Sequence, residues 1–203
     1  MRCTAVVLAG GRSRRMGSCK ALQPFLGRPL VAWSVEAMSR VCGEVVVPVR
    51  KGWGRRIGAV LPKAVRIVED AHPGLGPVGG LEAGARAALG VWVAVAPCDS
   101  PLVEPRLYRL LLSEARGSDG ALPFVGGFPE PLHGVYRRGP LLAALEKVIS
   151  EGGGSVRDAL RLLDLKRVGP RKLLKADPTG RTFWNIGTRE ALRTAEAAAA
   201  DLR

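Results

Sequence analysis

A pair of adjacent glycines followed by basic side chains is the first stretch of this chain whose residue types suit chemistry. Gly10 and Gly11 end an apolar run, and Arg15 and Lys20 are two of the four cationic side chains over residues 12–20. Glycine allows positive φ and lets backbone N–H groups approach an anion closely, while arginine and lysine add full positive charges. The sequence therefore predicts an anion-binding loop suited to phosphate.

The glycine spacing excludes two better-known phosphate-binding loops. A P-loop requires G-x-x-x-x-G-K-[ST], whereas Gly11 and Gly17 are six positions apart and Ser-Cys-Lys follows Gly17. A dinucleotide-binding fingerprint requires G-x-G-x-x-G, but Gly10 and Gly11 are adjacent. Taken alone, this stretch also fits an ordinary turn between a strand and a helix with a solvated basic face.

A second glycine-rich stretch follows a predicted strand at residues 64–68. Asp70 opens it, and residues 70–81 contain four glycines and two prolines, including Gly76 and Pro77. Proline restricts the backbone conformation and glycine leaves the backbone without side chains, so this loop suits a ligand that is contacted by main-chain groups. A rigid connection between a strand and a helix is the alternative for this loop.

Asp99 is a single carboxylate that follows the continuous apolar run of residues 91–96. Such a run is typical of a buried central strand in a parallel sheet, and open α/β sheets bind ligands at the carboxyl ends of their strands. A helix cap is the alternative role, but Pro101 and Pro105 separate Asp99 from the next helical pattern. We therefore expect Asp99 to have a functional role.

The elements that position these residues alternate between strand and helix. Up to residue 115 this alternation predicts a parallel sheet with right-handed crossovers and helices on both faces, and beyond it two strands around a loop predict an antiparallel pairing. Strands are expected at 5–8, 44–49, 64–68, 91–96, 121–124, 132–137 and 165–168, an extended segment at 183–186, and the main helices at 29–40, 81–89, 104–115, 140–150 and 155–163.

Composition favours a globular protein with anionic partners. The 203 residues fit one α/β domain, and the net charge of +13 favours anions. A nucleic acid is disfavoured as the partner because the basic residues are scattered and aromatic residues make up only 5%. Four dispersed cysteines and two histidines indicate neither a zinc site nor a disulfide framework. With no apolar run of membrane-spanning length and no signal-peptide pattern, we expect a soluble, cytoplasmic protein with no membrane partner.

Four motifs, in order along the chain, resemble those of one enzyme family. They are Leu-Ala-Gly-Gly-x-x-x-Arg-Met-Gly-x-x-Lys over residues 8–20, Gly-Arg-Pro-Leu over 27–30, Gly-Pro-x-x-Gly-Leu over 76–81 and Cys-Asp-x-Pro over 98–101. Through them the chain resembles the molybdenum cofactor guanylyltransferases, which are MobA-like nucleotidyltransferases. The resemblance extends to residues 131–136 and 185–188, so it covers nearly the whole length.

The resemblance implies a fold and a domain organisation. The fold would be a three-layer, Rossmann-like α/β nucleotidyltransferase fold, with a mostly parallel central sheet, an antiparallel strand and helices on both faces. Residues 1–203 would form a single nucleotidyltransferase domain, with 1–115 as the nucleotide-binding half and 116–203 as the acceptor-binding half.

The resemblance also implies an activity and its partners. GMP would be transferred from GTP to the terminal phosphate of molybdopterin or Mo-molybdopterin, giving the guanine dinucleotide cofactor and pyrophosphate. Mg²⁺ is the implied cofactor, and a molybdoenzyme or its chaperone is the implied protein partner.

Residue roles follow from the same resemblance. Arg15, Lys20 and Asp99 would be catalytic, Asp99 would hold the magnesium ion, and Asn185 would be an additional polar contact near it. The implied nucleotide-binding residues are Leu8, Ala9, Gly10, Gly11, Lys20, Asp70, Gly76, Pro77 and Asp99.

Three positions depart from the family pattern. Position 19, often aspartate in the family, is Cys19, and Gly187 replaces the second asparagine of the closing motif. Pro48 lies in a segment where relatives can carry an asparagine that meets the base.

The sequence is also compatible with other functions. A relative could use CTP, although that branch tends to have Thr-Ala-Ala-Gly where this chain has Leu-Ala-Gly-Gly at residues 8–11. Another relative could activate a phosphorylated sugar or small acid. A non-catalytic nucleotide- or nucleic-acid-binding protein is the alternative from a different class, and Asp99 argues against it because a carboxylate repels a phosphate backbone.

Overall fold

The computed structural model describes residues 2–10 and 19–199 of the chain. Gly11 and Arg15, which belong to the expected anion-binding loop, lie outside the described residues. Eight strands of the described part form the central sheet: β1 (Cys3–Leu8), β4 (Glu44–Val49), β5 (Arg66–Glu69), β6 (Trp92–Pro97), β7 (Gly120–Val125), β8 (Phe128–Pro129), β9 (Val135–Arg137) and β10 (Leu165–Val168). Their order is β10-β7-β9-β6-β1-β4-β5, and β8 pairs with β7.

Most of the sheet is parallel. β1 pairs in parallel with β4 and β6, β4 pairs with β5, and β7 pairs with β10. β9 is antiparallel to both of its neighbours, β6 and β7, so these two strands point the same way. The carboxyl ends of β1, β4, β5, β6, β7 and β10 therefore lie along one edge. The predicted mostly parallel sheet with an antiparallel strand is confirmed.

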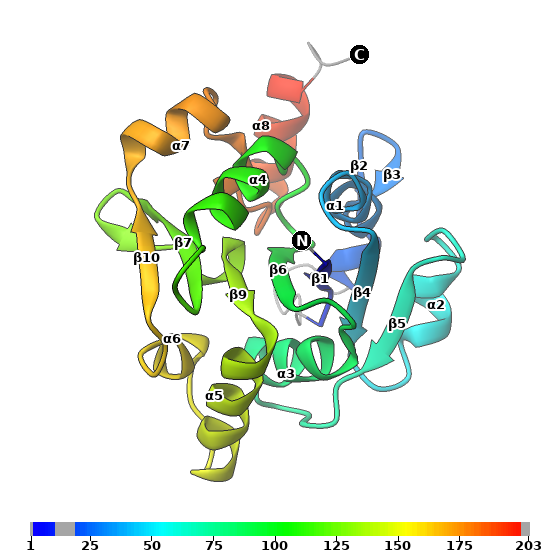
Figure 1. Cartoon of the computed structure of the whole chain (residues 1–203). Helices are drawn as coiled ribbons and strands as arrows, with labels where there is room; N and C mark the ends of the chain where they lie inside the picture. The colour runs from blue at the N-terminus through cyan, green and yellow to red at the C-terminus, as the bar shows by residue number, and fades with distance from the viewer. Residues whose placement is uncertain (1, 11–18, 200–203) are drawn as a thin grey trace.

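Helices cover both faces of the sheet and complete three layers (Figure 1). One face carries α1 (Leu30–Ser39), α2 (Gly54–Gly58), α4 (Pro105–Glu114) and α7 (Pro170–Ala176), and the other carries α3 (Pro77–Ala87), α5 (Arg138–Ser150) and α6 (Val156–Leu160). A smaller cluster joins α8 (Arg189–Ala199) to α1 and to the hairpin of β2 (Pro24–Phe25) and β3 (Arg28–Pro29). In the part of the chain that the structure describes, no helix is long and apolar enough to cross a membrane.

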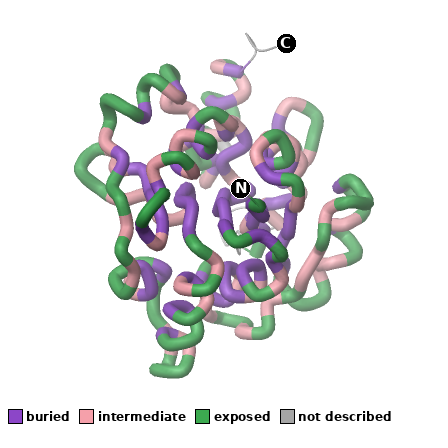
Figure 2. The backbone as a smooth tube through the Cα atoms, viewed as in Figure 1, coloured by how far each residue is buried: buried purple, intermediate pink, exposed green. Residues whose placement is uncertain are grey.

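Alternation along the strands divides the core between the two faces. In β1, Ala5 and Val7 belong to the cluster under α1, whereas Val6 belongs to the cluster under α3. Figure 2 shows the buried residues concentrated in the central strands and on the helix faces turned toward them. Gly84 of α3 lies against Val6, and a Cβ at this position would overlap the valine side chain. Glycine thus allows α3 to approach the sheet closely.

Helix α3 begins at Pro77, four residues before the start expected from the sequence pattern. Proline suits the first helical position because its φ is already helical and its missing N–H is not needed there. Gly76, immediately before it, has a φ of 60°, which glycine adopts readily. Gly79 and Gly80, which suggested a loop, are therefore helical.

One expectation is corrected in part, and three short elements are additional. Residues 183–186 are expected to be extended, but Phe183 ends the short 3-10 helix η3 (Arg181–Phe183), which begins after Gly180 in the left-handed region, whereas Trp184 is extended. The hairpin of β2 and β3 and the helix α7 are not among the elements that the sequence pattern predicted, because each is too short to show a clear period.

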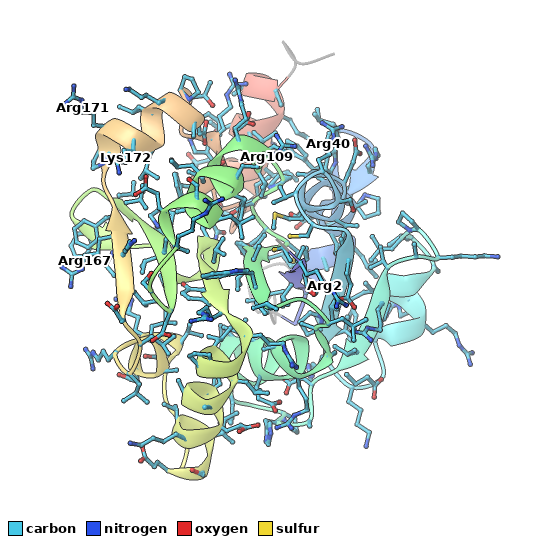
Figure 3. The ribbon with its side chains drawn as sticks, in the orientation of Figure 1. Arg2, Arg40, Arg109, Arg167, Arg171 and Lys172 are labelled. Carbon is cyan, nitrogen blue, oxygen red and sulfur yellow. The ribbon has the colours of Figure 1, made fainter. Side chains whose placement is uncertain are left out.

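The positive charge is distributed over separate elements. Figure 3 labels Arg40 at the end of α1, Arg109 on α4, Arg167 on β10, and Arg171 and Lys172 on α7. Some of this charge is paired within the fold, as in the contact of Lys172 Nζ with Glu114 Oε1 at 2.8 Å. These basic residues therefore form no continuous stripe along one helix of the described chain.

Candidate active site

A cleft of about 1010 Å³ opens at the carboxyl edge of the sheet. Parallel strands place the residues that follow them at the same edge, so Leu8, Pro48, Asp70 and Asp99 meet there although they lie far apart in the sequence. Two backbone bonds hold the strand ends together: Cys98 N–H donates to Leu8 O at 3.1 Å, and Ala9 N–H donates to Pro48 O at 3.2 Å. These bonds connect the ends of β1, β4 and β6 at the edge of the sheet where the cleft opens.

Lys20, Asp99 and Asn185 form a polar group within the cleft. The Lys20 ammonium contacts Asp99 Oδ2 at 2.5 Å and Asn185 Oδ1 at 3.2 Å. The backbone N–H of Ile186 donates to Asp99 O at 2.8 Å, which fixes the asparagine segment beside the aspartate. The Lys20 and Asp99 side chains are only 15% and 18% exposed, so their attraction is screened less than that of a surface pair. Three segments far apart in the sequence thus converge on one cation and two oxygen atoms.

Asp99 is not the cap of the following helix. Glu104 has that position, and its Oε1 accepts a hydrogen bond from the Arg106 N–H at 3.0 Å. The alternative structural role considered from the sequence is therefore taken by another residue, and the Asp99 carboxylate remains directed at Lys20.

Asp70 lies on the β5 side of the cleft against the first turn of α3. Its Oδ1 accepts a hydrogen bond from the His72 N–H at 2.7 Å. A Cβ at Gly79 would lie 2.6 Å from the same Oδ1, so a glycine at this position lets the carboxylate reach the helix. The glycines of the second motif therefore position an acidic side chain, which their sequence pattern alone does not reveal.

A buried histidine adjoins the site and was missed by the sequence analysis. Tyr108 Oη donates to Val95 O at 2.8 Å, so its oxygen is free to accept from His133 Nδ1–H at 3.2 Å, and His133 Nε2 then accepts from Ser100 Oγ at 3.5 Å. Burial lowers the pKa of His133 to about 4, although the negative charge of Asp99 acts in the opposite direction. His133 is thus neutral near pH 7 and supports Ser100, the neighbour of Asp99. Its position in the Pro-Leu-His motif was the available signal.

Two cysteines beside the polar group are protonated at neutral pH. Burial raises the pKa of the Cys98 thiol, and burial also raises the pKa of Cys19. Because the thiolate is the reactive form, neither residue is activated as a nucleophile. Both are free thiols in this structure.

The oxygen atoms of Asp99 and Asn185 suit a metal ion that takes only one or two ligands from the protein and its other ligands from water and substrate. No group of three or more His, Cys, Asp or Glu side chains suited to a metal is present among the described residues. Asp99 and Asn185 nevertheless offer two oxygen atoms to the same cation, the Lys20 ammonium. Magnesium is commonly held by one or two carboxylates together with substrate phosphates, so these residues fit it.

The structure brings most of the predicted site residues together. Leu8, Gly10, Lys20, Asp70, Gly76, Pro77, Asp99 and Asn185 all line the cleft. Ala9 is an exception, because it is buried and its backbone N–H is used in the bond to Pro48. The two other predicted residues, Gly11 and Arg15, lie outside the described residues. The roles of the individual residues remain predictions.

The fold and the cleft define an α/β protein of the nucleotidyltransferase class. The MobA-like NTP transferase domain matches residues 5–168, and the chain belongs to this family. The family relationship inferred from the four sequence motifs is confirmed.

Individual relatives agree over nearly the whole length. A probable molybdenum cofactor guanylyltransferase from Haloferax mediterranei is 32% identical over 93% of this chain and 90% of its own. A second, from Methanosarcina mazei, is 34% identical over 93% of this chain and 88% of its own. The crystal structure of molybdopterin-guanine dinucleotide biosynthesis protein A from Archaeoglobus fulgidus superposes with a TM-score of 0.84, at 28% identity, over 98% of this chain and 99% of that one.

Proposed function

We propose that this protein transfers GMP from GTP to the terminal phosphate of molybdopterin, with or without bound molybdenum, and releases pyrophosphate. The observation that carries the proposal is the Lys20, Asp99 and Asn185 group at the centre of a nucleotide-sized cleft. Support comes from the family of the chain and from relatives named molybdenum cofactor guanylyltransferase. The reaction would take place in the cytoplasm and pass its product to a molybdoenzyme or its chaperone.

The chemistry needs no general base. A phosphate monoester has a second pKa of about 6, so the acceptor is already an anionic nucleophile at neutral pH. Its oxygen forms a new bond to the α-phosphorus of GTP, and the bond from that phosphorus to the bridging oxygen breaks, so pyrophosphate leaves with the electron pair. Burial lowers the pKa of His133 to about 4, so this imidazole is a weak base, in agreement with a reaction in which no proton must be abstracted.

The barrier instead comes from bringing two anions together. Lys20 supplies a fixed positive charge in the cleft, and Asp99 and Asn185 orient it. The same two oxygen-bearing side chains would hold Mg²⁺, which neutralises phosphate charge when bound. Arg15 and the N–H groups of the glycine loop would add further positive charge around the phosphates.

The test is an assay of pyrophosphate release from each of the four ribonucleoside triphosphates, with molybdopterin and Mg²⁺. We expect release with GTP, and its loss by about 10²-fold or more in Asp99→Asn, since that variant loses the charge that holds the cation. The matched control is Asp164→Asn, because Asp164 is exposed and lies outside the cleft. Pyrophosphate release from CTP alone would show that the nucleotide substrate carries cytosine and not guanine. The absence of release from any of the four triphosphates would favour a non-catalytic binding protein.

A further inference from the structure

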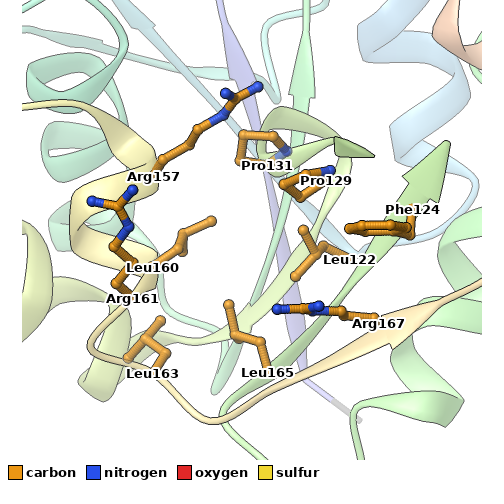
Figure 4. Close-up of a pocket in the computed structure, with 10 residues that line it drawn as sticks. All are labelled: Leu122, Phe124, Pro129, Pro131, Arg157, Leu160, Arg161, Leu163, Leu165 and Arg167. Atoms are coloured by element: carbon orange, nitrogen blue, oxygen red, sulfur yellow. The ribbon is translucent and has the colours of Figure 1, made fainter. Parts of the chain in front are cut away.

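A second cavity, of about 580 Å³, lies between α6 and the strands β7 and β10. Figure 4 shows its apolar wall, and the side chain of Leu160 points from α6 into the space. Arg157 and Arg161 extend from the α6 side, and Arg167 extends from β10 on the opposite side. The cavity therefore combines an apolar interior with three positive charges at its margins.

Strand alternation places the wall residues. Leu122 and Phe124 are two apart on β7, and Leu165 and Arg167 are two apart on β10, so each pair faces the same side of the sheet. The Arg167 guanidinium lies 5.5 Å from the centre of the Phe124 ring. A planar cation stacked on an aromatic ring presents a flat surface, which suits a flat ligand.

This cavity adjoins the cleft. Pro131 and Arg157 line both, and Arg157 reaches from α6 toward Pro131 in Figure 4. The positive charge of Arg157 also acts on Glu130, a carboxylate of the cleft whose pKa burial raises. An anionic group that passes from the cavity into the cleft would therefore meet Arg157 first.

The strand order places this cavity and Asp70 on opposite sides of β6, the strand that precedes Asp99. Asp70 and Pro48 follow β5 and β4, on one side of the strand that carries Asp99. β7 and β10 lie on the other side, beyond β9. A ligand in the cavity would thus approach the Lys20 and Asp99 group from the side opposite Asp70. Displacement at phosphorus requires the attacking and leaving oxygens on opposite sides, and this arrangement provides two approaches.

We propose that this cavity, formed by β7, β10 and α6, binds the flat, fused-ring part of the acceptor, while Arg157 guides its phosphate into the cleft. This inference rests on the proposed transfer reaction. The volume falls within the range of sites for small organic ligands, roughly 300–1,000 Å³. Arg167 and Arg161 would meet polar or anionic substituents at the ring margin.

The test compares Arg167→Glu with the matched control Arg171→Glu, since both residues are exposed arginines and Arg171 does not line the cavity. In the transfer assay, Arg167→Glu should raise the KM for molybdopterin about tenfold or more and leave the KM for GTP unchanged. Arg167→Lys, which keeps the charge, should restore part of the acceptor affinity. Arg171→Glu should match the unmodified protein. Equal effects of the two glutamate variants on the acceptor KM would overturn the proposal.

A direct binding measurement separates this inference from the transfer reaction. The probe is neopterin monophosphate, a fluorescent fused-ring compound with a terminal phosphate, and the competitors are neopterin and inorganic phosphate. Saturable binding that neopterin competes away and that Arg167→Glu weakens would support the cavity even if no GMP is transferred. Absence of binding, or competition by inorganic phosphate alone, would overturn the cavity while leaving the transfer assay to decide the proposed function.

Discussion

The Lys20 ammonium lies between two oxygen atoms contributed by residues that are 79 and 165 positions away in the sequence. A cation with two such partners is held in one place, and a fixed charge stabilises a developing negative charge without having to reorganise. Cys19 precedes this lysine, and burial raises the pKa of its thiol, so of these two neighbouring residues the lysine is the charged one at neutral pH. At the scale of residues, the site is built to hold a cation rather than to transfer a proton.

His133 provides a prediction on the pH dependence of stability. Its pKa is about 4 in the folded protein and near 6.5 in an unfolded chain, so between these values the unfolded state binds more protons. The contribution of His133 to the free energy of unfolding is therefore fully present above about pH 6.5. As the pH falls toward 4 this contribution is lost, and the free energy of unfolding decreases by about 3 kcal/mol at most. The free energy of unfolding, measured with urea at several pH values from 4 to 7, should therefore rise less steeply with pH in His133→Gln than in the unmodified protein.

The other histidine supplies the control for this measurement. The His72 side chain is 38% exposed, so the free energy of unfolding of His72→Gln should change with pH as it does in the unmodified protein. Equal slopes in His133→Gln and the unmodified protein would show that the buried imidazole does not govern the transition.

Helix α3 shows how an element can be positioned by what its residues lack. Three glycines in this helix are unfavourable for helix formation, each by about 1 kcal/mol relative to alanine. Two of them allow close contacts, Gly79 with the Asp70 carboxylate and Gly84 with Val6 of β1. The sequence pattern placed the start of the helix at residue 81 because Gly79 and Gly80 are unfavourable within a helix. The helix starts at Pro77 instead, a residue that suits the first helical position, and the glycines are accommodated because they allow these close contacts.

The close approach of α3 predicts a destabilised variant. Gly84→Ala should lower the free energy of unfolding by about 1–2 kcal/mol, because overlap with Val6 outweighs the gain in helix propensity. The measurement is urea unfolding followed by circular dichroism.

Gly80→Ala is the matched control, in the same helix and one turn earlier. The nearest atom to its Cβ would be Leu8 Cδ2 at 3.6 Å, which is ordinary contact, so this variant should be as stable as the unmodified protein or more so. Adding Val6→Ala should reduce the additional cost of Gly84→Ala. If Gly84→Ala is as stable as Gly80→Ala, the packing of α3 on β1 is not limited by this glycine.

At the scale of the whole molecule, a net charge of +13 is spread over helices and strands on several sides. Such a charge attracts any polyanion at low ionic strength, but the attraction is weakened by salt. Specific binding in a cleft depends less on the total charge than on positioned groups such as Lys20 and Asp99. These two kinds of anion binding can therefore be separated by ionic strength.

We predict that a short duplex DNA binds this protein only at low salt. Its affinity, measured by fluorescence anisotropy, should fall about 10³-fold or more between 50 and 200 mM salt if six or more phosphates are contacted. Asp99→Asn should leave this DNA binding unchanged while it lowers the rate of pyrophosphate release by about 10²-fold or more. Salt-resistant binding that depends on the DNA sequence would instead favour the nucleic-acid-binding alternative.

The sequence by itself determined the alternation of strands and helices, the location of the glycine-rich stretches and the positions of Asp70 and Asp99 after the strands that precede them. These features depend on local chemistry: side-chain periodicity, the φ freedom of glycine, and the tendency of α/β sheets to place ligands after their strands. The motifs also carried the resemblance to the family that the comparisons confirm.

Only the tertiary structure decided how β9 enters between β6 and β7, and therefore which side of Asp99 each half of the chain occupies. Three further features depend on the tertiary structure. They are the pairing of Lys20 with Asn185, the buried position of His133, and the position of Arg157 in the walls of both the cavity and the cleft. The physical reason is that these contacts join residues distant in sequence, whose proximity follows from packing and strand order. A local pattern predicts the elements, whereas the assembled sheet decides which of their ends meet.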